Sequence, residues 1–385
     1  MGYQRVVKPR LFVDMMSYLH ATGHGVYFNR KDSEHSDTPI AEQIHYGEKV
    51  DLLYCNTPSV IKFTEDQPNH GGDTLFNYID YDWVNTGINF PVLPIDCLVC
   101  LNHNLEGMKF SGGSWTDDVT EWGFPAEDNL VNWTDPIAHN GFSIRLKSTP
   151  VYTSIDTKRL YAYFSNHAGN VGQRYMGSYF FGKTWTPPHN PNLSMTVSRS
   201  FDGIKQTKTQ GGHTMNNINY LGNPNWAGHN AWELWNYPED PSVTLPNEDP
   251  DSTQQQMFIE DPKLNLGRLG RRSWKLTFEL VSESDIFAAL EQSNILPFDV
   301  GDTYPEGTET FTELGIDNPI LQEDNFISRV WIPTLGGKIP MLMQVDDTNN
   351  NPDQFAIVTI KSNTFSVKPK APNLYSFSMI LEESW

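Results

Sequence analysis

The feature that most constrains this chain is a succession of short apolar segments separated by Gly, Pro, Asn and Asp. No helical spacing links them, and the chain is 12% aromatic. Aromatic and β-branched residues between such turn signals favour strands. The segments of the first half are VDLLYC (50–55), VIKF (60–63), INFPVLPIDCLVCLNHNL (88–105), FSIRLKS (142–148), RLYAYFSN (159–166) and RYMGSYFFGKTW (174–185). We therefore predict a mostly-β protein whose N-terminal part is a β-sandwich or jelly roll of the galactose-binding kind.

The second half continues this pattern and adds one helix. RRSWKLTFELV (271–281) alternates Trp274, Leu276, Phe278 and Leu280 with polar residues, which predicts a half-buried strand. Ser282 and the acids after it predict a helix N-terminus, with IFAALEQ as a short helix. Further strands are predicted at 328–335, 340–345, 354–360, 364–371 and 374–385, the last two as a closing hairpin. This half is predicted to be a β-rich assembly domain.

A boundary between two domains, 1–188 and 189–385, is predicted at Pro187-Pro188. Just beyond it, Asp202-Gly203 predicts a hairpin between 193–201 and 204–212. The stretch at about 213–265 is rich in Asn, Pro and acid, and too long for an ordinary connection. We interpret it as an arm that neighbouring molecules order, with Trp226, Trp232 and Trp235 as interface residues, since tryptophans are costly to leave in water.

Residues 177–184, GSYFFGKT, match the phosphate-binding pattern G-x-x-x-x-G-K-[ST]. That loop needs a helix starting at its Lys-Ser/Thr, and here Pro187, Pro188 and Pro191 forbid one. Its middle, Ser-Tyr-Phe-Phe, prefers a strand. We interpret the match as coincidental and the segment as the last strand of the first domain.

Charge and cysteine content exclude several classes of partner. The formal net charge is −20, which gives no electrostatic footprint for nucleic acid and predicts repulsion from anionic membranes. Apolar runs are too short to span a bilayer, and the N-terminus lacks the pattern of a signal peptide. Cys97 and Cys100 have the C-x-x-C spacing, but on a strand they face opposite ways and are predicted to be buried thiols. We expect no metal, no cofactor and synthesis in a cytosol.

No catalytic constellation stands out, so the chain is not expected to be an enzyme. The loop from 102 to 133 combines Trp115, Trp122 and Trp133 with Asp117, a mixture that suits stacking on sugars and hydrogen bonding to their hydroxyls. The same tryptophans would equally serve a core or a subunit interface, and both interpretations stay open. A glycan-degrading carboxylate pair, such as Asp117 with Asp118, is the weakest hypothesis.

Six stretches, in the same order along nearly the whole chain, resemble structural proteins of tailed bacteriophages, especially those of marine phage genomes. They are KPRLFVD, LVCLNHNL, SYFFGKTWTPPHNP, SFDGIKQTKTQGG, GRLGRRSWKLTFELVSESDIF and QFAIVTIKSNTFSVKPKAPNLYSFSMILEESW. The resemblance implies a discoidin-like jelly roll followed by a domain like that of tail-tube and distal-tail hub proteins, which form rings.

The resemblance therefore implies a virion protein of the tail, tail tip or baseplate, made in the host cytoplasm. Its partners would be itself, as a homo-oligomeric ring, and other tail proteins. The long acidic arm departs from the family pattern. Two alternatives remain open: a carbohydrate-binding module for host recognition, which binds a surface glycan, and a head-associated structural protein.

Overall fold

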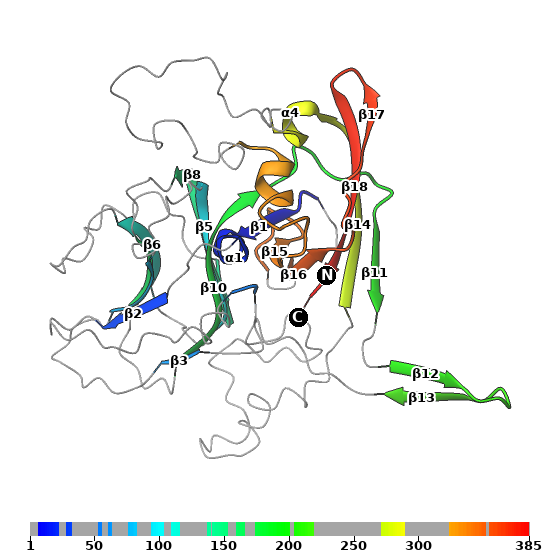
Figure 1. Ribbon diagram of the computed structural model, residues 1–385, viewed down its shortest axis with the longest axis horizontal. Coiled ribbons are helices and arrows are strands. Elements are labelled where there is room, and N and C mark those ends of the chain that lie inside the picture. The colour runs from blue at the N-terminus through cyan, green and yellow to red at the C-terminus, as the bar shows by residue number, and fades with distance from the viewer. Residues whose placement is uncertain are drawn as a thin grey trace, which may run out of the picture.

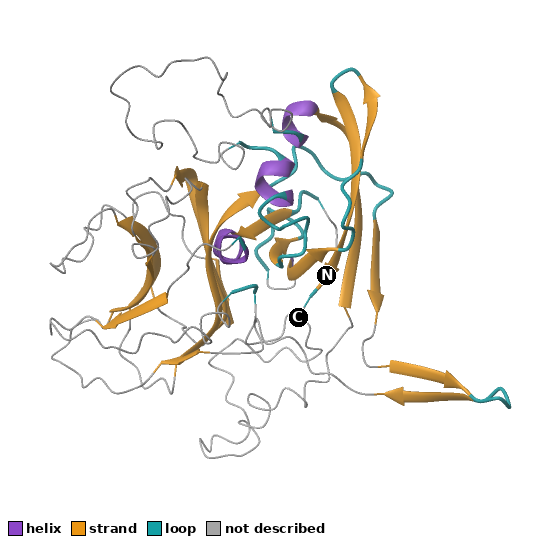
Figure 2. Ribbon diagram, in the orientation of Figure 1, coloured by secondary structure: helices purple, strands orange, loops and turns teal. Residues whose placement is uncertain are grey.

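In the computed structural model, the described residues form mostly antiparallel β-strands (Figures 1 and 2). The mostly-β prediction is confirmed. The described residues are 7–22, 28–32, 53–55, 61–63, 76–82, 94–103, 109–115, 137–139, 141–152, 159–165, 174–200, 204–218, 271–288, 323–351 and 354–384.

Twelve of the described strands form one sheet. They are β1 (Arg10–Asp14), β3 (Ile61–Phe63), β5 (Pro94–His103), β7 (Ile137–His139), β8 (Gly141–Tyr152), β10 (Arg174–Trp185), β11 (Thr196–Ser200), β14 (Arg271–Ser282), β15 (Met341–Gln344), β16 (Phe355–Ile360), β17 (Val367–Ala371) and β18 (Leu374–Glu383). The order is β11-β14-β18-β16-β15-β1-β10-β5-β8-β7, with β17 beside β18 and β3 beside β10. The first strand thus pairs with β15 near the C-terminus as well as with β10.

This sheet crosses the predicted domain boundary. β1, β5 and β10 belong to 1–188, whereas β11, β14, β15, β16 and β18 belong to 189–385. Strand β10, which contains GSYFFGKT, lies in the middle of the sheet between β1 and β5. The two predicted domains therefore share backbone hydrogen bonds, and the division at 188 stays a prediction.

A second sheet has four strands in the order β2-β4-β9-β6. These are β2 (Phe28–Asp32), β4 (Phe76–Asp82), β9 (Arg159–Ser165) and β6 (Lys109–Trp115). It lies on the side of β5 and β8 that faces away from β1 (Figure 1). The jelly-roll topology predicted for this part of the chain stays a prediction.

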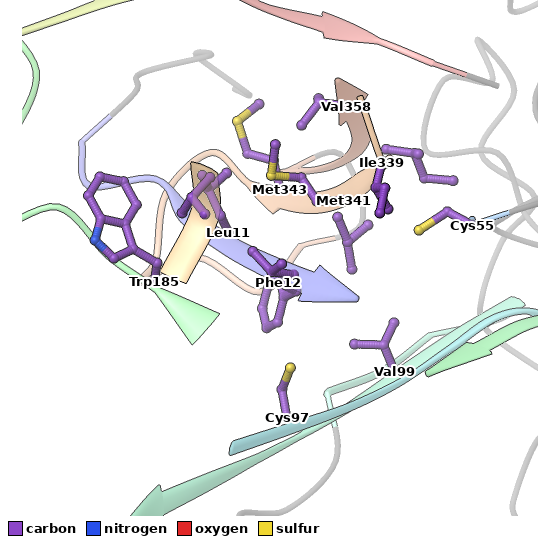
Figure 3. Close-up of a cluster of buried hydrophobic side chains, with 14 of the residues drawn as sticks. Leu11, Phe12, Cys55, Cys97, Val99, Trp185, Ile339, Met341, Met343 and Val358 are labelled. Atoms are coloured by element: carbon purple, nitrogen blue, oxygen red, sulfur yellow. The ribbon is translucent and has the colours of Figure 1, made fainter. Parts of the chain in front are cut away.

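The core consists of buried side chains from strands of the main sheet in both halves of the chain, from residues 15–19, and from the helical turn at 327–331. Every residue of β5 is buried, as the prediction for 88–105 required. Figure 3 shows Cys97 and Val99 of β5 pointing toward Phe12 of β1, with Met341 and Met343 on the far side. Burial of apolar surface on this scale is the main favourable term in folding.

Strand β14 confirms the predicted alternation up to one irregularity. Trp274, Leu276 and Phe278 are buried, but Leu280 is 59% exposed. The register with β18 shifts between Phe278 and Val281, and Leu280 has a φ of 60°. This β-bulge moves Leu280 to the solvent side and Val281 into the core, so the prediction for Leu280 was wrong.

The helix after β14 begins where predicted and is shorter than predicted. The Ser282 side chain accepts a hydrogen bond from the Asp285 amide and caps α4 (Glu283–Ile286). Phe287 is already extended, with a φ of −100° and a ψ of 140°. Earlier in the chain, helix α1 (Met15–Ala21) follows β1 directly and is capped by Asp14.

Residues 328–335 were predicted to form a strand, and this was wrong. They belong to a single π-helical turn, η4 (Ile327–Trp331), followed by further turns. Asn325 starts the turn, because its side chain accepts a hydrogen bond from the Ser328 amide at 2.8 Å. Gly336 and Gly337, with φ values of 71° and 80°, then lead the chain into β15. Local capping thus outweighed the strand preference of the aromatic and branched residues.

The predicted hairpin around Asp202-Gly203 was also wrong in its pairing. Residues 196–200, as β11, pair with β14, whereas β12 (Ile204–Lys208) pairs with β13 (Thr214–Ile218). The hairpin turn lies at 209–213, where Gly212 has a φ of 83°. Part of the predicted arm is therefore strand β13, and 219–265 lies outside the described residues.

Candidate functional site

The phosphate-loop pattern is occupied by a structural ion pair. The Lys183 ammonium lies 2.6 Å from a carboxylate oxygen of Asp96 on the neighbouring strand β5, and both side chains are at least 92% buried. The Thr184 amide and hydroxyl donate to the same carboxylate at 2.6 and 2.9 Å. Asp96 therefore holds the lysine, amide and hydroxyl that a nucleotide would use.

The glycine of the same motif serves strand pairing. A Cβ on Gly182 would lie 2.1 Å from the Val13 carbonyl oxygen of β1. Because real Cβ atoms do not approach so closely, only glycine fits at this position. The prediction that GSYFFGKT is a strand is confirmed.

A second buried ion pair joins the two long strands of the C-terminal half. Arg272 of β14 binds Glu383 of β18 through its backbone amide, Nε and Nη2, at 2.8 to 3.2 Å. Nη2 also donates to the Phe355 carbonyl, and the guanidinium stacks over Trp274. Removing one partner of such a pair strongly destabilises the protein, because the other charge is then buried without compensation.

The polar groups around Asp14 form a hydrogen-bonded cluster that is partly buried. Ser17 donates through its amide and its hydroxyl to the Asp14 carboxylate, and the Tyr54 amide donates to the Ser17 hydroxyl at 2.7 Å. The Tyr54 hydroxyl in turn meets His20 Nδ1 at 2.8 Å. Burial raises the pKa of Asp14 to about 7, although the hydrogen bonds from Ser17 oppose that rise. The cluster ties α1 to residues 53–55, which form a turn and not the predicted strand.

The three thiols are buried and unpaired. Burial raises the pKa of Cys97 and of Cys100 well above its usual range, so both stay neutral and unreactive near pH 7. Within the described part of the chain, no three His, Cys, Asp or Glu side chains gather closely enough to hold a metal ion. The interpretation of Cys97 and Cys100 as buried thiols is confirmed.

His103 is a buried histidine of strand β5. Its Nε2 lies 2.9 Å from the Ser143 hydroxyl of β8, and only 3% of the residue is exposed. Burial lowers the pKa of His103 to about 4, so the ring is neutral at pH 7. A neutral histidine paired with a serine could in principle activate it, but Ser143 is itself 8% exposed and offers a substrate little access.

Most of the predicted ligand residues fall outside the described part of the chain. Trp122, Trp133 and Asp117 lie in 116–136, and Trp226, Trp232 and Trp235 lie in 219–270, both beyond the described ranges. Trp115 ends β6, in register with Arg159 of β9. The glycan site and the tryptophan interface therefore stay predictions.

The outer edge of the main sheet is a feature that sequence reasoning missed. Among the described strands β11 has one neighbour, β14, and four of its five residues are exposed. Leu193, three residues before it, is fully exposed. Among the described strands β17 also has one neighbour, β18, but β17 carries Lys368, Pro369 and Lys370, residues that oppose strand addition.

The hairpin β12–β13 follows this edge in the chain and projects away from the body of the molecule (Figure 1). All residues from 206 to 216 are exposed, including Met215 at 61%. Thr209 fixes its turn: its amide donates to the His213 carbonyl at 2.9 Å, and its hydroxyl accepts from the His213 amide at 3.2 Å. The hairpin thus has a defined turn while its surface is open to a partner.

No family model, curated protein or solved structure matches this chain. Among the described residues, no helix has the length and apolar character needed to cross a membrane.

Proposed function

We propose that this chain is a structural subunit of a tailed-phage virion, in the tail or the tail tip, and that it assembles as a homo-oligomeric ring. The observation that carries the assembly part of this proposal is the edge at β11, which is open as far as the described strands extend. A strand at the edge of a sheet presents unpaired backbone donors and acceptors, and proteins normally guard such edges with Lys, Pro or a covering segment.

A comparison of the two edge strands β11 and β17 supports this interpretation. β17 carries Lys368, Pro369 and Lys370, which guard it, whereas β11 reads Thr-Val-Ser-Arg-Ser, with Arg199 as its one charged residue and no proline. Leu193 adds a fully exposed apolar side chain beside β11. An edge of this kind suits strand addition by a neighbouring chain. The virion part of the proposal is supported by the resemblance of the six sequence stretches.

The buried polar groups support a structural role in preference to catalysis. Lys183 with Asp96 and Arg272 with Glu383 bind each other inside the sheet and present no charge to a substrate. They fix neighbouring strands, which is the requirement of a rigid subunit.

Sedimentation velocity of the purified chain, together with mass spectrometry of purified phage particles, tests the proposal. We expect a discrete homo-oligomer in solution and peptides of the chain in the particles. Leu193→Lys is expected to weaken association, because a charge at an open edge opposes strand addition. Leu335→Lys, at another exposed leucine, is the matched control. A strictly monomeric protein that is also missing from the particles would contradict the proposal.

A further inference from the structure

We propose that the hairpin β12–β13 docks on an acidic surface of a second copy of this chain, with Lys208 and Lys205 as its charged contacts. This inference rests on the proposed function and names the surface through which the copies meet.

The first reason is the position of the hairpin. It forms a two-stranded sheet separate from the main sheet, with five residue pairs from Ile204↔Ile218 to Lys208↔Thr214. A two-stranded hairpin alone is at best marginally stable in water. Packing against another surface would stabilise it, and its projection from the body makes a surface of a neighbouring molecule accessible to it.

The second reason is its charge, which is opposite to that of the chain. Residues 204–218 contain two of the chain's 27 Lys and Arg residues, Lys205 and Lys208, and none of its 47 Asp and Glu residues. The formal net charge of the whole chain is −20. Two copies therefore repel each other over most of their surfaces. At the positively charged hairpin this repulsion becomes attraction.

The third reason is that Lys208 has no acidic neighbour on its own hairpin. It is exposed and pairs across the ribbon with Thr214. Two exposed lysines elsewhere in the described chain lie beside carboxylates: Lys361 beside Glu382 at 2.5 Å and Lys370 beside Glu279 at 3.6 Å. A carboxylate of a second copy would supply to Lys208 what Glu382 supplies to Lys361. Electrostatic complementarity of this kind sets orientation and register between partners.

Zero-length carbodiimide cross-linking tests the contact directly, since it joins lysines only to carboxylates that touch them. The full chain is mixed as ¹⁴N and ¹⁵N copies, cross-linked and digested. We expect mixed-isotope peptides that join Lys205 or Lys208 to Asp or Glu. Cross-links from these lysines exclusively within one copy, or exclusively to a different protein in purified particles, would overturn the proposal.

A pair of double variants provides the second arm. Lys205→Glu with Lys208→Glu is expected to weaken self-association about tenfold or more, and to remove the weakening that raised salt causes in the wild type. Lys368→Glu with Lys370→Glu on β17 changes the net charge equally and is expected to weaken association less than threefold. Equal weakening by both pairs would indicate general repulsion and overturn the proposal. Urea unfolding midpoints confirm that the variants fold.

The outcomes separate this inference from the proposed function. Oligomers that ignore the hairpin substitutions overturn only the docking proposal and leave the assembly function in place. A wild type that stays monomeric at all salt concentrations overturns both.

Discussion

Lys183 and Lys208 belong to strands of the same protein and have opposite surroundings. Lys183 lies in the middle of the main sheet, nearly inaccessible and bound to Asp96 at 2.6 Å. Lys208 lies on the projecting hairpin, exposed, on a segment without any acid. The sequence makes Lys183 look functional because it stands in a phosphate-loop pattern. In the structure Lys183 stabilises the fold through its ion pair, whereas Lys208 is exposed and accessible to another molecule.

This difference shows that the role of a lysine depends on whether a carboxylate lies beside it and on whether it is exposed to water. A buried cation must be paired, since burying an uncompensated charge costs several kcal/mol. An exposed cation costs nothing to leave in water and is available for a partner. Asp96 is 87 positions away from Lys183 in the chain, so no local pattern indicates which of the two cases applies.

The largest expected effect comes from exchanging each lysine for alanine. Lys183→Ala leaves the Asp96 carboxylate buried without its cation and should lower the free energy of unfolding by about 3–5 kcal/mol. Lys208→Ala should change it by less than about 0.5 kcal/mol, as for other exposed positions. Urea unfolding measures both. Combining Lys183→Met with Asp96→Asn should recover most of the loss, and equal effects of the two alanine variants would refute the contrast.

Neighbouring glutamates at the end of β18 sharpen the same comparison. Glu383 pairs with buried Arg272, whereas Glu382 pairs with Lys361, which is 60% exposed. Glu383→Gln should cost about 3 kcal/mol because the guanidinium remains charged and buried. Glu382→Gln should cost about 0.2–1 kcal/mol, the usual value of a surface pair. If both variants unfold at the same urea concentration, burial does not decide the worth of these pairs.

The smallest effect expected in the wild type is the net pH dependence of stability, because two groups contribute slopes of opposite sign. The folded-state pKa of Asp14, about 7, is above its ordinary value of 3.8, so its contribution is complete below about pH 4 and is lost as pH rises to about 7. The folded-state pKa of His103, about 4, is below its ordinary 6.5, so its contribution is complete above about pH 6.5 and is lost as pH falls to about 4. Between pH 4 and 6.5 the two slopes oppose each other.

Single substitutions should separate these slopes. Asp14→Asn keeps an oxygen to accept from the Ser17 amide and should make stability rise with pH over this window. His103→Gln should make it fall. Each slope is at most about 1.4 kcal/mol per pH unit. Tyr54, Cys55 and Cys97, which face Asp14, have raised pKa values and stay neutral throughout. Parallel urea midpoints for both variants and the wild type would contradict the assignment.

Where burial alone decides an element, the sequence was sufficient. The buried strand β5 was predicted from its apolar run, and the alternation of β14 up to Phe278 from its apolar periodicity, because both patterns report burial directly. The sequence was not sufficient where a local hydrogen bond, or the choice of a neighbouring strand, decides the type or position of an element. Asn325 turned 327–331 into a π-helical turn, and Thr209 with Gly212 placed the hairpin turn seven residues beyond Asp202-Gly203.

The candidate site could be predicted only in part. The sequence predicted correctly that GSYFFGKT is a strand, because its aromatic middle favours one and prolines after Thr184 forbid a following helix. The sequence did not indicate that Asp96 would form an ion pair with Lys183, or that β11 would lie at the edge of the sheet. Both features depend on which strands become neighbours. The tryptophans proposed for glycan binding lie mostly outside the described residues and stay predictions.

Hydrogen–deuterium exchange of the β11 and β12–β13 amides, followed across the protein concentration at which the chain associates, tests the account most directly. If neighbouring copies cover this edge, these amides exchange rapidly in the dilute protein and slowly in the associated protein, while those of β17 do not change. Equal exchange at β11 and β12–β13 in the dilute and associated states would contradict the central claim that this edge and hairpin are where the copies meet.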